Sequence, residues 1–145
     1  MLYFTISLQR AGKTTFAKQW KNEGGNRVLV SGDQIRLAVY NKRFSLRGEP
    51  IVHAVKQYML RTLLAEGYDV LYDDTNTSWK SVEMVFEIDP NARYIIIDCD
   101  KKVCQERAIL TGQEDLVEVI ERCYPNYIST IHRLRTEFPH LECRV

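Results

Sequence analysis

The segment Ser7–Thr15, with the sequence SLQRAGKTT, has residue types and spacing suited to chemistry on a phosphate group. It follows the apolar run Leu2–Ile6, and apolar residues at helical spacing resume directly after it. A loop between a strand and a helix directs backbone N–H groups and the positive end of the helix dipole at an anion. Gly12, Lys13 and Thr14 match the end of the pattern G-x-x-x-x-G-K-[ST], in which the lysine reaches the terminal phosphates of a nucleotide and the hydroxyl group binds Mg²⁺. We therefore expect a phosphate-binding loop, or P-loop, at this place.

The first position of the loop departs from the pattern, because Ser7 stands where the pattern has glycine. A small residue can begin the turn there in an ordinary backbone conformation. The alternative is an ordinary strand-to-helix turn that happens to contain a lysine, but the correct flanking segments favour a nucleotide site. The residues that we expect to bind the nucleotide are Gln9, Arg10, Ala11, Gly12, Lys13, Thr14 and Thr15.

A second pair of candidate residues, Asp33 and Arg36, follows the mostly apolar segment Arg27–Ser31, which is predicted to be a strand. Residues three apart on a helix share a face, so both side chains would point into the same crevice. A carboxylate in such a crevice can accept a proton from an attacking hydroxyl group, and the fork of an arginine can hold a phosphate or a carboxylate. The alternative is a helix N-cap with a surface arginine, and the P-loop upstream favours the catalytic interpretation.

A third group of polar residues, Asp73, Asp74, Thr75 and Asn76, ends the next apolar segment. An acid after a buried strand can join the ligand shell of Mg²⁺. Asp73 and Asp74 are therefore candidate metal ligands, and the sequence does not say which of the two faces the metal. A polar turn is the alternative interpretation.

Arg107 lies on the helix predicted after the strand 94–98. Many kinases close a helical lid that carries an arginine over the phosphates, which offsets charge in the transition state. On spacing alone, a solvated surface arginine fits this position equally well.

Strands and helices alternate along the chain. We expect strands over residues 2–6, 27–31, 69–74 and 94–98, and helices over 13–22, from 33, over 51–66 and 79–88, and from 101, with a basic loop over 40–50. Thr111 and Glu114 match a capping box for a further helix, Pro125 is expected to interrupt it before a last helix over 127–135, and the tail 141–145 is either an edge strand or disordered. This order predicts an α/β fold with a mainly parallel sheet of four to five strands, helices on both faces and ligands at the carboxyl edge of the sheet.

Length and composition set further limits. A chain of 145 residues with 45% hydrophobic and 27% charged residues is expected to be a single soluble domain over 1–145. The formal net charge of +1 excludes a global electrostatic attraction to nucleic acid or membrane. The four cysteines include no C-x-x-C pair, so zinc is not expected. We find no signal peptide and no apolar run of membrane-spanning length, and we expect a cytoplasmic, reduced protein.

The order of these motifs resembles a known family, the phage-type polynucleotide 5′-kinase domain of the P-loop kinase superfamily. The resemblance covers residues 2 to about 127. It rests on the P-loop, the segment Ser31–Arg36, the triplet Asp74-Thr75-Asn76, Asp98 after an apolar strand, Cys104-x-x-Arg107 and the segment Val119–Tyr124.

The resemblance implies a function, cofactors and residue roles. It implies an ATP-dependent kinase that phosphorylates the 5′-hydroxyl end of a nucleic acid with Mg²⁺, in which Asp33 is the general base. Arg36 would grip a phosphate of the acceptor, Lys13 and Thr14 would bind the donor phosphates and Mg²⁺, and the lid would carry Arg107. The resemblance also places Thr75 and Asn76 beside the acceptor.

Two positions depart from the family. Ser7 replaces the first glycine of the P-loop, and Thr111 stands where the family lid commonly has a second arginine. Arg107 or Arg10 would then have to supply the missing charge. Two other functions therefore stay open, namely a small-molecule or nucleoside kinase of the same fold and a nucleotide-binding regulatory protein with little turnover. DNA or RNA preference and oligomeric state are not determined by the sequence.

Overall fold

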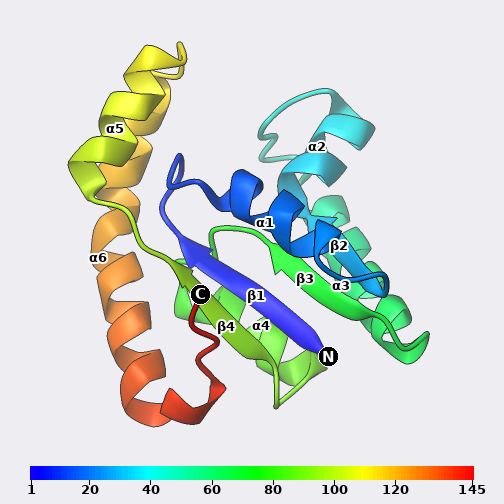
Figure 1. The fold of residues 1–145 in the computed structure, drawn as a ribbon. Coiled ribbons are helices and arrows are strands. Elements are labelled where there is room, and N and C mark those ends of the chain that lie inside the picture. The colour runs from blue at the N-terminus through cyan, green and yellow to red at the C-terminus, as the bar shows by residue number, and fades with distance from the viewer.

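A four-stranded parallel sheet forms the centre of the molecule, which the computed structural model describes over residues 1–145. Its strands lie in the order β2-β3-β1-β4, with β1 (Leu2–Ser7) and β3 (Asp69–Asp73) in the middle and β2 (Arg27–Ser31) and β4 (Arg93–Ile97) at the edges (Figure 1). Because the strands are parallel, their carboxyl ends meet at one edge of the sheet. The predicted α/β fold and its four strands are confirmed.

Six α-helices and one short 3₁₀ helix connect and cover these strands. They are α1 (Lys13–Asn22), α2 (Gly32–Tyr40), α3 (Glu49–Ala65), α4 (Trp79–Ile88), α5 (Lys101–Leu110), α6 (Asp115–Glu137) and η1 (Pro139–Leu141). Helix α1 covers one face of the sheet, while α3, α4 and α6 cover the other, and α5 lies against α6 at one side of the molecule (Figure 1). Both faces are therefore buried, as expected for a parallel sheet with helical crossovers.

Alternation along the strands divides the core into two parts. On β1, Leu2, Phe4 and Ile6 are fully buried in the larger cluster with α3, α4 and α6. Tyr3 points to the opposite face and packs its ring against Trp20 of α1 at 5.5 Å between ring centroids. The period of two along a strand thus explains why one apolar segment serves both faces.

Helix α6 is longer than the sequence predicts, because it continues through Pro125. Proline lacks the N–H that a helix interior requires, and its ring crowds the preceding turn. On both sides of it, however, α6 buries apolar side chains against the core, including Ile120, Tyr127 and Leu134. The expected break between two helices was wrong, because this shared burial outweighs the local cost.

The predicted capping box is also wrong. The Thr111 hydroxyl donates to the carbonyl oxygens of Arg107 at 2.8 Å and Ala108 at 3.3 Å, so it closes the end of α5. Glu114 is the N-cap of α6 and makes no side-chain capping bond. Helix α3 begins at Glu49, two residues before the predicted start at 51. The carboxyl-terminal tail forms no strand, only an isolated bridge between Tyr94 and Glu142.

Candidate nucleotide and acceptor site

The P-loop runs from the end of β1 to the start of α1. Ser7 is fully buried there, and its N–H donates to the carbonyl oxygen of Thr75 at 2.9 Å. Arg10 and Gly12 have positive φ angles of 66° and 101°, and glycine adopts such angles without strain. Gly12 is the N-cap of α1 and makes no side-chain capping bond, so the first N–H groups of the helix face the loop opening. This geometry suits an anion.

Lys13 lies within ion-pair distance of acids on two neighbouring elements, β3 and α2. Its Nζ lies 3.0 Å from Oδ1 of Asp73, at the end of β3, and 3.9 Å from Oδ2 of Asp33, in the first turn of α2. Burial raises the pKa of Asp73, and the charge of Lys13 partly offsets that rise. The structure thus brings together three residues predicted separately from the sequence.

Several buried polar atoms around the P-loop have no hydrogen-bond partner. They are Ser7 Oγ, Gln9 Oε1, Asp73 Oδ1 and Asn76 Oδ1; elsewhere only the Tyr94 hydroxyl is in this state. The one close partner of Asp73 Oδ1 is Lys13 Nζ, in an ion pair at 3.0 Å, so this oxygen still has acceptor capacity. Such a cluster is unusual in a protein interior and is typical of a site that binds a ligand, ion or water.

The donor set here fits Mg²⁺. Asp73 Oδ1 and the hydroxyl of Thr14 are oxygen ligands of the kind that Mg²⁺ prefers. The chain has no group of three His, Cys, Asp or Glu residues that could hold a metal by themselves. Mg²⁺ in nucleotide sites commonly takes one or two protein ligands and completes its shell with phosphate oxygens and water.

Asp74, the other predicted metal ligand, faces a different set of groups. Its Oδ2 lies 3.2 Å from Lys56 Nζ and accepts from the Tyr72 hydroxyl at 3.1 Å, and its Oδ1 accepts from the Thr75 N–H at 2.9 Å. Burial alone would raise the pKa of Asp74, but Lys56 and the hydrogen bond from Thr75 outweigh it and hold the pKa below its usual value. Both carboxylate oxygens are therefore already engaged, and Asp73 is the acid that faces Lys13.

Arg36 is held by two carboxylates. Its Nε and Nη2 donate to Glu49 at 2.7 and 3.0 Å, and its Nη1 donates to Asp33 at 3.1 Å. The Glu49 hydrogen bonds raise the pKa of Arg36, although burial opposes this. A Cβ placed on Gly32 would lie 2.7 Å from Asp74 Oδ2 and 3.2 Å from Arg36 Nη1, so a larger residue there would have to displace the Asp74 carboxylate from its partners.

Two residues of this network, Glu49 and Lys56, were missed by the sequence analysis. Both lie on α3, far in sequence from their partners Arg36 and Asp74. Lys56 is only 8% exposed, which is unusual for lysine. It lies four residues from each of the apolar, fully buried Val52 and Leu60 on the same face of α3, and this spacing is the signal that could have predicted its burial. Glu49 precedes Pro50 at the start of α3, a position that itself suits an acid.

Thr75 and Asn76 form hydrogen bonds with the end of β1, where the P-loop begins. The Asn76 amide donates to the carbonyl oxygen of Thr5 at 2.9 Å, and Asn76 is 4% exposed with a φ of 48°. Thr75 accepts from the Ser7 N–H. These contacts fix the ends of β1 and β3 against each other.

Arg107 reaches the P-loop from α5. Its Nη1 lies 3.2 Å from the carbonyl oxygen of Arg10 and 3.6 Å from the sulfur of Cys99. Arg43 of the α2–α3 loop donates to Asp115 at the start of α6, at 2.9 Å. The α5–α6 hairpin is thus in contact with both the P-loop and the α2–α3 loop.

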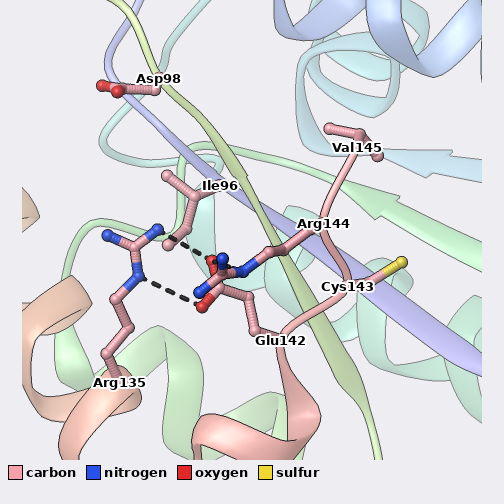
Figure 2. A pocket seen from close by; sticks show the side chains of 7 residues that line it. All are labelled: Ile96, Asp98, Arg135, Glu142, Cys143, Arg144 and Val145. Atoms are coloured by element: carbon pink, nitrogen blue, oxygen red, sulfur yellow. Dashed lines mark hydrogen bonds and ion pairs between the residues drawn. The ribbon is translucent and has the colours of Figure 1, made fainter.

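Two hollows lie near these elements. One, of about 730 Å³, opens beside the P-loop and is lined by Thr14, Ser31, Asp33, Asp73 and apolar side chains of α2 and α3. The other, of about 490 Å³, lies between β4 and the carboxyl-terminal tail; Figure 2 shows Arg135 facing Glu142 there, with bonds of 2.8 and 3.2 Å, and Asp98 apart from them. Only the first hollow contains predicted site residues.

A P-loop at the first strand of a parallel sheet, with a lysine, a buried acid and a hydroxyl at its mouth, defines an α/β nucleotide-binding protein of the P-loop kinase fold. The chain belongs to the AAA domain family AAA_33, whose model matches residues 3–112. No curated protein matches the chain.

Solved structures show the same fold. A chain of the Pnkp1/Rnl/Hen1 complex has a TM-score of 0.67 at 22% identity, with 73% of this chain and 38% of that chain covered. A chain of the Pnkp1/Rnl/Hen1 RNA repair complex has a TM-score of 0.64 at 19% identity, with 83% and 45% covered. The crystal structure of APE1195 gives 0.64 at 19% identity, with 81% and 71% covered. The chain therefore spans less than half the length of the chains that it matches in the two complexes.

These findings confirm the predicted resemblance in fold and P-loop type. None of the helices combines the length and the apolar character needed to cross a bilayer.

Proposed function

We propose that residues 1–145 form a single kinase domain that transfers the γ-phosphate of ATP, with Mg²⁺, to the 5′-hydroxyl end of a nucleic acid, as in nucleic-acid repair. The observation that carries this proposal is the meeting of Lys13, Asp33 and Asp73 at the mouth of the P-loop. A phosphate donor, a metal and a base for the acceptor hydroxyl would all be needed at that point. The similarity in fold to chains of two Pnkp1/Rnl/Hen1 complexes, one of them called an RNA repair complex, supports a nucleic acid as the acceptor.

The residues would divide the reaction between them. The N–H groups of the P-loop and Lys13 would hold the donor phosphates, and Arg107 would offset charge on the transferred phosphoryl group. Mg²⁺, held by Thr14 and Asp73, would neutralise phosphate charge when bound. Oδ1 of Asp33 accepts from Arg36, and Oδ2, on a side chain that is 59% exposed, would accept the proton of the attacking hydroxyl group. Arg36 beside it would bind a phosphate of the acceptor, while Thr75 and Asn76 keep the supporting loop in place.

A second candidate function is a small-molecule kinase of the same fold. The observation in its favour is the charge around Arg36, where Asp33, Glu49 and Asp74 all act on one guanidinium group. Three carboxylates at one place repel an anionic acceptor, whereas they do not repel a neutral one. A nucleotide-binding regulatory protein remains the third candidate.

Transfer of labelled phosphate from ATP separates these functions. We expect a 5′-hydroxyl oligonucleotide and a nucleoside 3′-monophosphate to be phosphorylated, and the bare nucleoside to be a poor acceptor. Lys13→Ala should abolish transfer on every acceptor. Because Lys13 is buried and pairs with the buried Asp73, thermal melting of this variant is measured alongside to confirm that it folds. Equal use of the nucleoside and its 3′-monophosphate would favour the small-molecule kinase, and nucleotide binding with no acceptor used would favour the regulatory protein.

A further inference from the structure

Cys99 and Cys104 lie close together where β4 leads into α5. The carboxylate of Asp100 caps α5 by accepting from the Lys102 N–H at 2.8 Å, and its carbonyl oxygen accepts from the Cys104 N–H at 3.0 Å. This turn folds Cys104 back over Cys99, whose carbonyl oxygen is 4.0 Å from the Cys104 sulfur. Burial and, next, the neighbouring Cys99 thiol raise the pKa of Cys104 to about 12.

The two thiols differ in exposure. Cys99 is partly exposed, so a small solute can reach its sulfur. Cys104 is fully buried against the core that includes Ala108 and Ile120. A partly exposed thiol next to a buried thiol is an arrangement in which an oxidised cysteine can be resolved to a disulfide.

Cys99 is also connected to the P-loop. Arg107 Nη1 contacts both the Cys99 sulfur at 3.6 Å and the carbonyl oxygen of Arg10 at 3.2 Å. The sulfur is therefore one of two groups that hold this guanidinium beside the loop. A change at Cys99 alters a direct neighbour of a proposed phosphate-binding residue.

We propose that Cys99 is a site of oxidation by a hydroperoxide, that Cys104 resolves the product to an intrachain disulfide, and that this disulfide loosens the hold of Arg107 on the P-loop. In the first step the Cys99 sulfur attacks the O–O bond of the peroxide, forming a sulfenic acid and releasing water. In the second step the Cys104 sulfur attacks the Cys99 sulfur, the S–O bond breaks, and the departing hydroxide takes the Cys104 proton to give water. Two thiols lose two electrons, and one hydrogen peroxide becomes two waters.

The effect on nucleotide binding follows from the position of the sulfur, and this part rests on the proposed function. A bond to Cys104 draws the Cys99 sulfur towards the core and away from Arg107. Loss of a hydrogen bond of ordinary strength would weaken nucleotide affinity about two- to twelvefold. A reductant such as dithiothreitol should restore the affinity.

The disulfide can be tested without any activity assay. Trypsin cuts after Lys101, Lys102 and Arg107, so Cys99 and Cys104 fall on separate peptides. After treatment of the folded protein with hydrogen peroxide, mass spectrometry should show these two peptides joined, and dithiothreitol should separate them. Cys143→Ser, which changes a cysteine of the tail, should leave the joined peptides in place, whereas Cys99→Ser should remove them. Oxidation without this link, or a link to Cys123 or Cys143 instead, would overturn the proposal.

The functional consequence is measured by calorimetric titration of a non-hydrolysable ATP analogue. Affinity should fall on oxidation of the wild type and of Cys143→Ser. It should not respond to peroxide in Cys99→Ser or in Cys104→Ala. Two variants are used so that a folding defect in one of them does not decide the result. Complete disulfide formation with unchanged affinity would refute the link to Arg107. If the reduced protein binds no nucleotide, the proposed function fails, and the peptide result still decides whether the disulfide forms.

Discussion

Glu49 offers a sharp test of the role of Arg36. The guanidinium group has five N–H donors, of which Glu49 takes two and Asp33 takes one. Two donors therefore remain for a phosphate, and Glu49 orients Arg36 without blocking it. We predict that Glu49→Ala raises the KM of a phosphate-bearing acceptor and leaves the KM of ATP nearly unchanged.

The expected magnitude follows from the contacts. The side chains of Arg36 and Glu49 are 13% and 28% exposed, so solvent screens the pair only in part. A charge-assisted hydrogen bond contributes about 1.5–3 kcal/mol. If Arg36, without Glu49 to orient it, loses one such bond to the acceptor phosphate, KM rises roughly ten- to a hundred-and-fifty-fold. Glu49→Gln keeps one acceptor oxygen and should lie between the wild type and Glu49→Ala.

The assay is steady-state phosphorylation of a nucleoside 3′-monophosphate at saturating ATP. Glu66→Ala removes an exposed acid at the far end of α3 and serves as the matched control, with no expected change. Thermal melting of each variant confirms that the fold is intact. If KM stays constant or falls in Glu49→Ala, Glu49 competes with the acceptor or plays no part, and the reasoning is refuted.

Three further predictions concern the network and α6. Asp33→Asn should lower kcat by about a hundredfold or more, as for a lost general base, with nearly unchanged calorimetric affinity for an ATP analogue; a collapse of that affinity would assign Asp33 to the phosphate or metal site. Because the pKa of Asp74 is lowered by folding, its carboxylate contributes stability that is complete above the usual aspartate pKa of about 4 and is lost as the pH falls through the lower folded value. Asp74→Asn should therefore flatten the acid side of a plot of Tm against pH, and an acid side as steep as that of the wild type would contradict this. Pro125→Ala should stabilise α6 by up to about 3 kcal/mol, which calorimetry would record as a higher Tm, whereas an equal or lower Tm would show that the helix is already adapted to proline.

The P-loop could be predicted from the sequence because its residues are neighbours in the chain. Gly12, Lys13 and Thr14 need only a strand before them and a helix after them, and both have clear periodic patterns. The convergence of Asp33 and Asp73 on Lys13 followed from one further rule, that parallel strands place their carboxyl ends together. These parts of the site depend on local pattern and topology alone.

The division of work between Asp73 and Asp74 could not be predicted in this way. Successive residues at a strand end point to opposite sides, and the sequence does not show which side carries Lys13 and which carries Lys56. The structure decides this through the packing of α3, which brings Lys56 to Asp74 and Glu49 to Arg36. The prediction that Pro125 ends a helix was wrong for a related reason. The local cost of proline is visible in the sequence, whereas the compensating burial of α6 is not.

The strand order has a consequence for how the protein is made. Strand β1 is synthesised first, yet both of its partners come much later, since Leu2 pairs with Val70 and Tyr3 with Arg93. No hairpin can form in the meantime, because all pairings are parallel and need long crossovers. A nascent chain therefore carries an unpaired apolar strand until β3 and then β4 leave the ribosome, and such non-local pairing is slow. The P-loop, although it directly follows β1, can take its final shape only after β3 and β4 have been synthesised.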